Sequence, residues 1–556
     1  MKINGAQIII KLLVQHGIKR VSGIPGGANL PIYDALVDSP IQHILARHEQ
    51  GSGFIAQGEA RVGGKVAVCM ASSGPGATNL VTAVADAHLD SIPLIAITGQ
   101  VPSSMIGTDA FQECDTFGLM LPITKHNWLV RSATELLEVI PEAFRIAQSG
   151  RPGPVSIDVP KDVQLEEIEI DSLPTNLSLD EKPSATKEQL TLFMQMLSEA
   201  KRPILMVGGG VIHSGRAELL YQFSEEQDIP SVASFMGLGV IPSSHPLSLG
   251  MLGMHGAQAT NMALEECDLL IAAGVRFDDR ATGKVSEFCP QAKIVHIDID
   301  HSELGKIKQP CLGITADVCN VIEQILAEIS PQKRDPWRQR IVLLKHDFGL
   351  GATEGFSLTS PQGLITILGE LCGAETNVVT DVGQHQMWAA QLFPFERARQ
   401  WISSGGLGSM GFGLPAAIGA ALEQPDRMAL CISGDGSIMM NIQELETVAE
   451  HHLNVKVVIM NNNNLGMVRQ QQKLFYKERF SGINNQRGAN YALIAEGMGV
   501  PGINLENEAD PQHALAAALV SPGPCLINVP ICEQEMVFPM VPPGAANRDM
   551  IVEQNR

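Results

Sequence analysis

The stretch from residue 427 to residue 466 constrains the fold more than any other part of the chain. Two apolar runs, 428–433 and 455–460, each fit a buried strand, and a helical pattern lies between them. Parallel strands need such a crossover connection, so the stretch predicts a parallel βαβ unit. The first run leads into Gly434-Asp435-Gly436 and the second into four consecutive asparagines. Asp435 and Asn462 are therefore expected at the same edge of one sheet.

These side chains favour a site for a metal ion and a diphosphate. An Asp carboxylate, an Asn side-chain oxygen and a loop carbonyl are the hard oxygen ligands that Mg2+ prefers, and they leave room for phosphate oxygens and water. Gly434 and Gly436 let the backbone approach a ligand, and Ser437 stands near a helix N-terminus, which favours anions. An ordinary Gly-Asp-Gly turn is the alternative interpretation.

The same alternation of short apolar runs and helical patterns recurs along the 556 residues. It predicts an α/β fold of three consecutive domains with mainly parallel sheets, over 1–165, 188–335 and 355–535, followed by a tail over 536–556. The predicted strands are 66–70, 94–98, 155–159, 204–208, 268–275, 293–300, 428–433, 455–460, 525–529 and one near Val378. The acidic, proline-containing segment near 165–187 is expected to be a linker. The N-terminal stretch fits an amphipathic first helix rather than a signal peptide.

Composition excludes several classes of partner. Lys and Arg number 39 against 60 Asp and Glu, and the formal net charge of −21 opposes binding to nucleic acid or to an anionic membrane. No apolar run is long enough to span a bilayer. Ten cysteines without a CxxC pair are typical of a reducing compartment, so a cytoplasmic location is expected.

Further motifs resemble one known family over almost the whole chain. They are GIPGG (23–27), RHEQ (47–50), SSGPGATN (72–79), GTDAFQE (107–113), GRPGPV (150–155), MLGMHG (251–256), GVRFDDR (274–280), TDVGQHQMW (380–388) and GGLGSMGFGLPAAIGA (405–420). With GDGS and MNNNNLGMV, they resemble the bacterial acetohydroxyacid synthases (acetolactate synthases), which depend on thiamine diphosphate (ThDP). GVRFDDR is similar to the anabolic branch that also carries FAD.

The resemblance implies a function and an assembly. The activity would be the decarboxylative condensation of pyruvate with a second 2-keto acid, pyruvate or 2-ketobutyrate, in branched-chain amino acid biosynthesis. The first domain would bind the ThDP pyrimidine, the middle domain FAD, and the third domain the diphosphate. Pyrimidine and diphosphate sites would come from different subunits, so a homodimer would be the smallest competent unit. Pairing of dimers into a tetramer and a small regulatory subunit remain open.

Two other functions stay open at this point. A pyruvate oxidase or decarboxylase of the same ThDP layout is one alternative, and a non-catalytic homologue with the same fold is the other. The stretches RFDDR and MLGMHG argue against the first. The presence of Glu49, Asp435 and Asn462 together argues against the second.

The resemblance also implies cofactor residues. Glu49 would be the carboxyl group that faces N1' of the aminopyrimidine and promotes its imino form, although an isolated Glu in this position also fits a helix-capping acid. The remaining ThDP residues would be Pro75, Asn79, Val382, Gly383, Gln384, His385, Gly408, Met410, Asp435, Gly436, Ser437, Asn462, Asn464, Gly466 and Met467. Asp435, Asn462 and the main-chain oxygen of Asn464 would bind Mg2+. The residues around FAD would be Arg151, Gly208, Gly209, Gly210, His255, Gly274, Arg276, Asp278, Arg280, Asp298, Ile299, Asp317 and Val318.

A few residues match substrate-facing positions of the family. Phe111 and Gln112 would line the substrate approach, Lys125 would stand at the channel mouth, and Arg276 would meet the carboxylate of the second keto acid, which a guanidinium suits. Loop packing, a solvated surface lysine and an Arg276 pair with Asp278 or Asp279 are the respective structural alternatives. Gln471 departs from the family pattern, because most members have Trp there.

Overall fold

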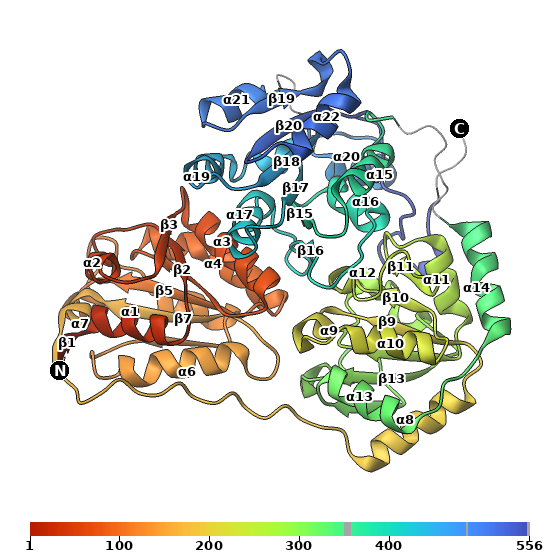
Figure 1. Cartoon of the computed structure of the whole chain (residues 1–556), viewed down its shortest axis with the longest axis horizontal. Helices are drawn as coiled ribbons and strands as arrows, with labels where there is room; N and C mark the ends of the chain where they lie inside the picture. Colours follow the sequence, from red (N-terminus) through yellow and green to blue (C-terminus); the bar gives the residue numbers. More distant parts are fainter. Residues whose placement is uncertain (350–356, 485–487, 553–556) are drawn as a thin grey trace.

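The described residues fold around three parallel sheets, each with six strands. The computed structural model describes residues 1–349, 357–484 and 488–552. The three sheets form successive lobes of the molecule, which run from the N-terminal red and orange lobe through the yellow and green one to the teal and blue one (Figure 1). The prediction of three α/β domains with mainly parallel sheets is confirmed.

The N-terminal sheet has the strand order β3-β2-β4-β5-β7-β6. Its strands are β2 (Arg20–Gly23), β3 (Gln42–Leu45), β4 (Ala67–Ala71), β5 (Leu94–Gln100), β6 (His126–Leu129) and β7 (Val155–Pro160). Its helices are α1 (Gly5–Gln15), α2 (Leu30–Val37), α3 (Glu49–Gly63), α4 (Pro75–Leu89), α5 (Thr116–Met120), α6 (Leu136–Gln148) and α7 (Lys161–Leu165). The expected first helix is α1, whose apolar side chains Ile8, Ile9 and Leu12 are buried.

The middle sheet has the order β11-β10-β9-β12-β13-β14. Its strands are β9 (Pro203–Val207), β10 (Ser231–Ala233), β11 (Ser248–Met251), β12 (Leu269–Ala273), β13 (Lys293–Asp298) and β14 (Leu312–Thr315). Its helices are α8 (Lys187–Glu199), α9 (Gly209–Ser214), α10 (Glu218–Glu226), α11 (Gln258–Glu266), α12 (Asp279–Thr282), α13 (Val318–Glu328) and α14 (Asp335–Phe348). The segment expected as a linker begins with β8 (Glu167–Glu169), which pairs antiparallel with β1 (Lys2–Asn4), and then runs without helix or strand to α8 (Figure 1).

The C-terminal sheet has the order β16-β15-β17-β18-β20-β19. Its strands are β15 (Asn377–Thr380), β16 (Trp401–Ile402), β17 (Ala429–Gly434), β18 (Val455–Asn461), β19 (Gly502–Asn504) and β20 (Cys525–Pro530). Its helices are α15 (Pro361–Cys372), α16 (Gln384–Leu392), α17 (Gly413–Glu423), α18 (Asp435–Ile438), α19 (Leu445–Glu450), α20 (Gly466–Phe475), α21 (Tyr491–Gly497) and α22 (Pro511–Val520).

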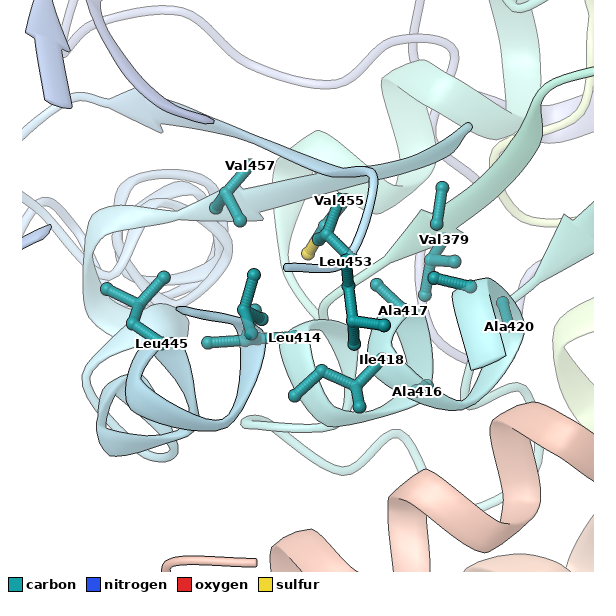
Figure 2. Close-up of a cluster of buried hydrophobic side chains, with 14 of the residues drawn as sticks. Val379, Leu414, Ala416, Ala417, Ile418, Ala420, Leu445, Leu453, Val455 and Val457 are labelled. Atoms are coloured by element: carbon teal, nitrogen blue, oxygen red, sulfur yellow. The ribbon is translucent and has the colours of Figure 1, made fainter. Parts of the chain in front are cut away.

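The N-terminal and C-terminal domains share a hydrophobic core where α3 meets α17. Phe54 of α3 stacks edge-on against Phe412, with 5.2 Å between the ring centroids. Around α17 this core continues to Val379 and Val455 on the C-terminal strands (Figure 2). The two helix backbones nearly touch, because a Cβ on Gly58 would lie 2.1 Å from the Ala416 carbonyl oxygen. The two domains are thus joined by direct packing as well as by the chain.

Candidate active site

The two motifs at the ends of β17 and β18 meet in one small pocket. The strands pair in parallel with Gly434 opposite Met460, so Asp435 and Asn462 follow at the same sheet edge. Both line a pocket of about 80 Å3 and both are buried, Asp435 with 2% of its surface exposed. Asn463 has a φ of 53°, a conformation that Asn tolerates better than most residues, and this turn lets Asn462 and Asn464 face the same pocket.

Hydrogen bonds fix the side chains of this pocket. The backbone N–H of Asn464 donates to Asn462 Oδ1 at 3.0 Å, and Asn462 Nδ2 donates to Gln384 Oε1 at 3.4 Å. The Tyr491 hydroxyl donates to the backbone oxygen of Asp435 at 3.0 Å. The backbone of Asp435 and the side-chain oxygen of Asn462 are therefore each held by a hydrogen bond, which suits the strict geometry that Mg2+ demands.

Most residues predicted to contact ThDP line this pocket. They are Val382, Gly383, Gln384, His385, Met410, Asp435, Gly436, Ser437, Asn462, Asn464, Gly466 and Met467. Burial lowers the pKa of His385 to about 3, so its imidazole is neutral at physiological pH. Its Nε2 atom has no hydrogen-bond partner among the described residues. Gly408 lines the larger cavity instead.

The remaining predicted ThDP residues lie elsewhere in the same chain. Glu49 begins α3, Pro75 begins α4, and Asn79 Nδ2 donates to Glu49 Oε2 at 2.9 Å. These three residues line neither the small pocket nor the larger cavity. One chain alone therefore does not bring the Glu49 carboxyl group to the Asp435 pocket.

A larger cavity of about 720 Å3 lies between the middle and C-terminal domains and reaches the N-terminal domain. Its volume is within the range of small-molecule and cofactor sites. Of the residues predicted around FAD, all except Gly208 line it: Arg151, Gly209, Gly210, His255, Gly274, Arg276, Asp278, Arg280, Asp298, Ile299, Asp317 and Val318. Gly208 packs behind this wall, since a Cβ on it would lie 2.2 Å from the Gly274 carbonyl oxygen.

Ion pairs hold part of the wall of the large cavity. Arg151 Nε donates to Ser91 Oγ at 2.8 Å and Arg151 Nη1 pairs with Glu303 at 2.8 Å. Arg276 differs from Arg151, because it forms no hydrogen bond or ion pair among the described residues. Asp279 pairs with Arg280 instead, at 3.7 Å. The guanidinium of Arg276 is thus available to an anion that enters the cavity.

Three predicted substrate residues lie outside both cavities. Phe111 is 87% exposed, and Gln112 follows it with a φ of 61°. Lys125 Nζ donates to the backbone oxygens of Ile146 and Ser149, the latter at 2.6 Å, and burial lowers its pKa to about 8. A Cβ on Gly74 would lie 2.8 Å from the Gln112 carbonyl oxygen, so the Gln112 loop packs on the start of α4. The roles of these residues stay predictions.

The sequence motifs did not reveal the methionine-rich wall of the large cavity. Met206, Met236, Met251, Met254, Met387 and Met540 all line it. Methionine adapts its shape to flat or irregular ligands, but in sequence it resembles any core residue. Several of these methionines lie at or just after strand ends, which is the one signal that could have distinguished them.

Two features are absent from the described residues. No group of three or more His, Cys, Asp and Glu side chains there could hold a metal ion. A magnesium site built from one carboxylate, one amide and one backbone oxygen is a different ligand set. Within the same residues, no helix has both the length and the apolar character needed to cross a lipid bilayer.

Comparison with known families defines the class of protein. Three family models match the chain in order: the N-terminal TPP binding domain of thiamine pyrophosphate enzymes over 3–119, their central domain over 190–325, and their C-terminal TPP binding domain over 381–529. The three domains are thus those of a thiamine-diphosphate enzyme, and Asp435 and Asn462 lie within the stretch that the C-terminal TPP binding model matches.

Full-length relatives place the chain more narrowly. It is 55% identical over 553 residues to the acetolactate synthase isozyme 1 large subunit of Escherichia coli, covering 99% of this chain and 98% of that protein. It is 45% identical over 551 residues to the isozyme 2 large subunit of the same organism, with 99% of each chain covered. A chloroplastic acetolactate synthase 1 of Zea mays is 45% identical over 569 residues, covering 99% of this chain and 89% of that protein. The chain belongs to the acetolactate synthase large subunit family.

Proposed function

We propose that this protein condenses pyruvate with a second 2-keto acid and releases CO2. Two pyruvates would give 2-acetolactate, and pyruvate with 2-ketobutyrate would give 2-aceto-2-hydroxybutyrate, as branched-chain amino acid biosynthesis requires. The observation that carries the proposal is the full-length identity to acetolactate synthase large subunits, with Asp435 and Asn462 together in one buried pocket. The domains would extend over 1–165, 188–335 and 355–535, with a tail over 536–556.

The Asp435 pocket would hold Mg2+ and the cofactor's diphosphate. Asp435 and Asn462 would supply side-chain oxygens and Asn464 its backbone oxygen, which are the ligands that Mg2+ prefers. Gly436 and Ser437 lie directly after Asp435 in the same pocket, and these small residues would leave space for a phosphate. Because Asn462 and Asn464 are fixed by hydrogen bonds, little reordering would accompany metal binding.

Glu49 would control a proton on the cofactor's pyrimidine ring. When bound, ThDP supplies a thiazolium ring that accepts the electron pair left as CO2 departs. The Glu49 carboxyl group would face N1' of the pyrimidine, and the amide of Asn79 orients that carboxyl group through a hydrogen bond of 2.9 Å.

A second copy of the chain would complete each site. Glu49 lies outside the pocket that holds Asp435, so the carboxyl group that acts there would come from the partner. Exposed apolar side chains near the Gln112 loop support this dimer, because Met105, Phe111 and Leu121 would otherwise face water. This arrangement would also bring Phe111 and Gln112 to the substrate. The large-subunit relatives further support a small regulatory partner.

The large cavity would hold FAD. Backbone contact between Gly210 and Gly274 forms part of its wall, since a Cβ on Gly210 would lie 2.6 Å from the Gly274 Cα. The condensation has no net electron transfer, so the flavin would support the fold of the site rather than its redox chemistry. Arg276, whose side chain has no partner among the described residues, would bind the carboxylate of the second keto acid.

Product identification tests the proposal. Purified protein with pyruvate, ThDP, Mg2+ and FAD should form acetolactate. Free acetaldehyde would indicate a decarboxylase, and acetyl phosphate with oxygen uptake would indicate an oxidase. An absence of any product from protein that binds all three cofactors would favour the non-catalytic homologue.

A further inference from the structure

All three domains meet at one buried polar junction beside the large cavity. The three-domain junction consists of Arg61, Asp86 and Asp90 from the N-terminal domain, Ile212 from the middle domain, and Arg399 with the loop 403–409 from the C-terminal domain. Arg399 Nη1 donates to the Arg61 backbone oxygen at 2.8 Å, and Arg399 Nη2 donates to the Ile212 backbone oxygen at 2.9 Å. A single arginine thus links the three domains.

At the centre of the junction two carboxylates share the guanidinium of Arg61, whereas the second cation, Arg399, donates to the backbone oxygens of Arg61 and Ile212. Arg61 Nη2 pairs with Asp86 at 3.1 Å and with Asp90 at 2.9 Å, and the side chains of both aspartates are completely buried. Two carboxylates share one guanidinium, so the remaining negative charge needs hydrogen-bond donors to be tolerated inside the protein. The loop 403–409 supplies them.

The two aspartates hold this loop at several points. Gly405 N donates to Asp90 Oδ2 at 3.0 Å, and Gly406 N donates to Asp90 Oδ1 at 2.7 Å. Ser404 Oγ and Ser409 Oγ both donate to Asp86 Oδ1, the latter at 3.1 Å. A shift of the loop would leave a buried carboxylate without donors, and this penalty fixes the loop's conformation.

The same loop shapes both cavities. Residues 404–408 line the large cavity, and Met410, directly after the loop, lines the large cavity and the Asp435 pocket alike. The Gly405 backbone lies against Met236 of the cavity wall, since a Cβ on it would be 2.4 Å from the Met236 sulfur. The position of the loop therefore sets the shape of the space around both cofactors.

We propose that Asp90, together with Asp86, is a positioning residue that fixes the loop 403–409 and thereby couples the N-terminal domain to the binding of both ThDP and FAD. The inference rests on the proposed function, because that function identifies the ligands of the two cavities. Beyond that function, the proposal states that the charge of Asp90, in the N-terminal domain, governs how tightly the other two domains bind their cofactors. Neither carboxylate has to touch the reacting atoms for this effect.

The test compares Asp90→Asn with a matched control, Glu423→Gln. Arg20 of β2 pairs with Glu423 at the end of α17, so the control also removes a carboxylate charge from a contact between N-terminal and C-terminal domains. Glu423 lines neither cavity, whereas Asp90 lines the large one but not the Asp435 pocket, so the ThDP titration separates positioning of the loop from direct contact with FAD. Half-saturating concentrations of FAD and ThDP are measured by fluorescence titration of cofactor-free protein, and thermal midpoints are measured alongside.

Asp90→Asn should raise both half-saturating concentrations about tenfold, because an amide cannot satisfy two backbone N–H groups and a guanidinium at once. Glu423→Gln should change neither half-saturating concentration by more than about twofold, because Arg20 keeps Glu59 as a partner. This should hold even if Glu423→Gln lowers the thermal midpoint as much as Asp90→Asn does. The proposal would be overturned if Asp90→Asn raised the half-saturating concentrations of FAD and ThDP no more than the control does.

A second variant covers the case in which Asp90→Asn does not fold. Ser404→Ala removes only the hydroxyl that donates to Asp86 and accepts from Ser409 N at 2.8 Å. It should weaken FAD and ThDP binding in the same direction, and unchanged affinity for both would contradict the proposal. The titrations need no turnover, so a wild-type protein that binds both cofactors but makes no acetolactate would refute only the proposed function.

Discussion

Two inactive variants should restore activity when they assemble together. Glu49 lies outside the pocket that contains Asp435, so a complete site is expected to combine Glu49 of one chain with Asp435 of another. Glu49→Gln and Asp435→Ala chains should each be nearly inactive alone. In a two-fold dimer of one chain of each kind, one site carries both changes and the other carries neither.

The expected magnitude follows from counting intact sites. A mixed dimer isolated through two different affinity tags should have about half of the wild-type activity, and an unsorted equal mixture about a quarter. The assay is acetolactate formation from pyruvate with saturating ThDP, Mg2+ and FAD. The matched control places both substitutions in one chain and pairs it with a wild-type chain, which leaves no intact site.

The control also discriminates between the two geometries. If each site were built within one chain, the cis double variant paired with wild type would keep about half of the activity and the trans mixture would be inactive. That reversed result would refute the shared site and the assignment of Glu49 to the partner's pocket.

Three further outcomes are expected. Glu49→Gln should retain ThDP yet slow hydrogen–deuterium exchange at C2 of the cofactor, followed by NMR; exchange as fast as in the wild type would remove Glu49 from its assigned role. Reconstitution with a 5-deazaflavin analogue of FAD should keep most of the activity, whereas complete loss with normal binding and folding would contradict a structural flavin. Gln471 lines the large cavity, and Gln471→Trp should raise the ratio of acetohydroxybutyrate to acetolactate from mixed keto acids, because an extra buried methylene is worth about 1–3 kcal/mol in a fitted pocket. The same variant should become more sensitive to sulfonylurea-type inhibitors, and a wild type that already strongly prefers 2-ketobutyrate, unchanged by Trp, would contradict this reasoning.

Long apolar strands were predictable, and short edge strands were not. The runs 455–460 and 525–529 match β18 and β20 closely, because strands buried on both faces have continuous apolar sequences. Edge strand β16 has only two residues, Trp401 and Ile402, and β19 has only three. Such short strands contain too few residues to show a hydrophobic periodicity in the sequence. They are defined only by hydrogen bonds to the neighbouring strand.

The same contrast holds for the site. The shared sheet edge of Asp435 and Asn462 followed from the βαβ connection, which is local in sequence. The junction of Asp90 with Gly405 and Gly406 joins residues far apart in the chain, and no spacing rule predicts it. The methionine wall was missed because the residue type alone does not distinguish a cavity lining from a core.

The contact between α3 and α17 limits how this protein can move. A Cβ on Gly419 would lie 2.0 Å from the Ile55 carbonyl oxygen, and one on Gly58 would lie just as close to α17. Helices in backbone contact cannot slide along each other without driving neighbouring side chains into the opposite backbone. The N-terminal and C-terminal domains of one chain should therefore travel as a single rigid body. Any opening that admits substrate would then come from the middle domain or from the boundary between two copies, never from a hinge at this contact.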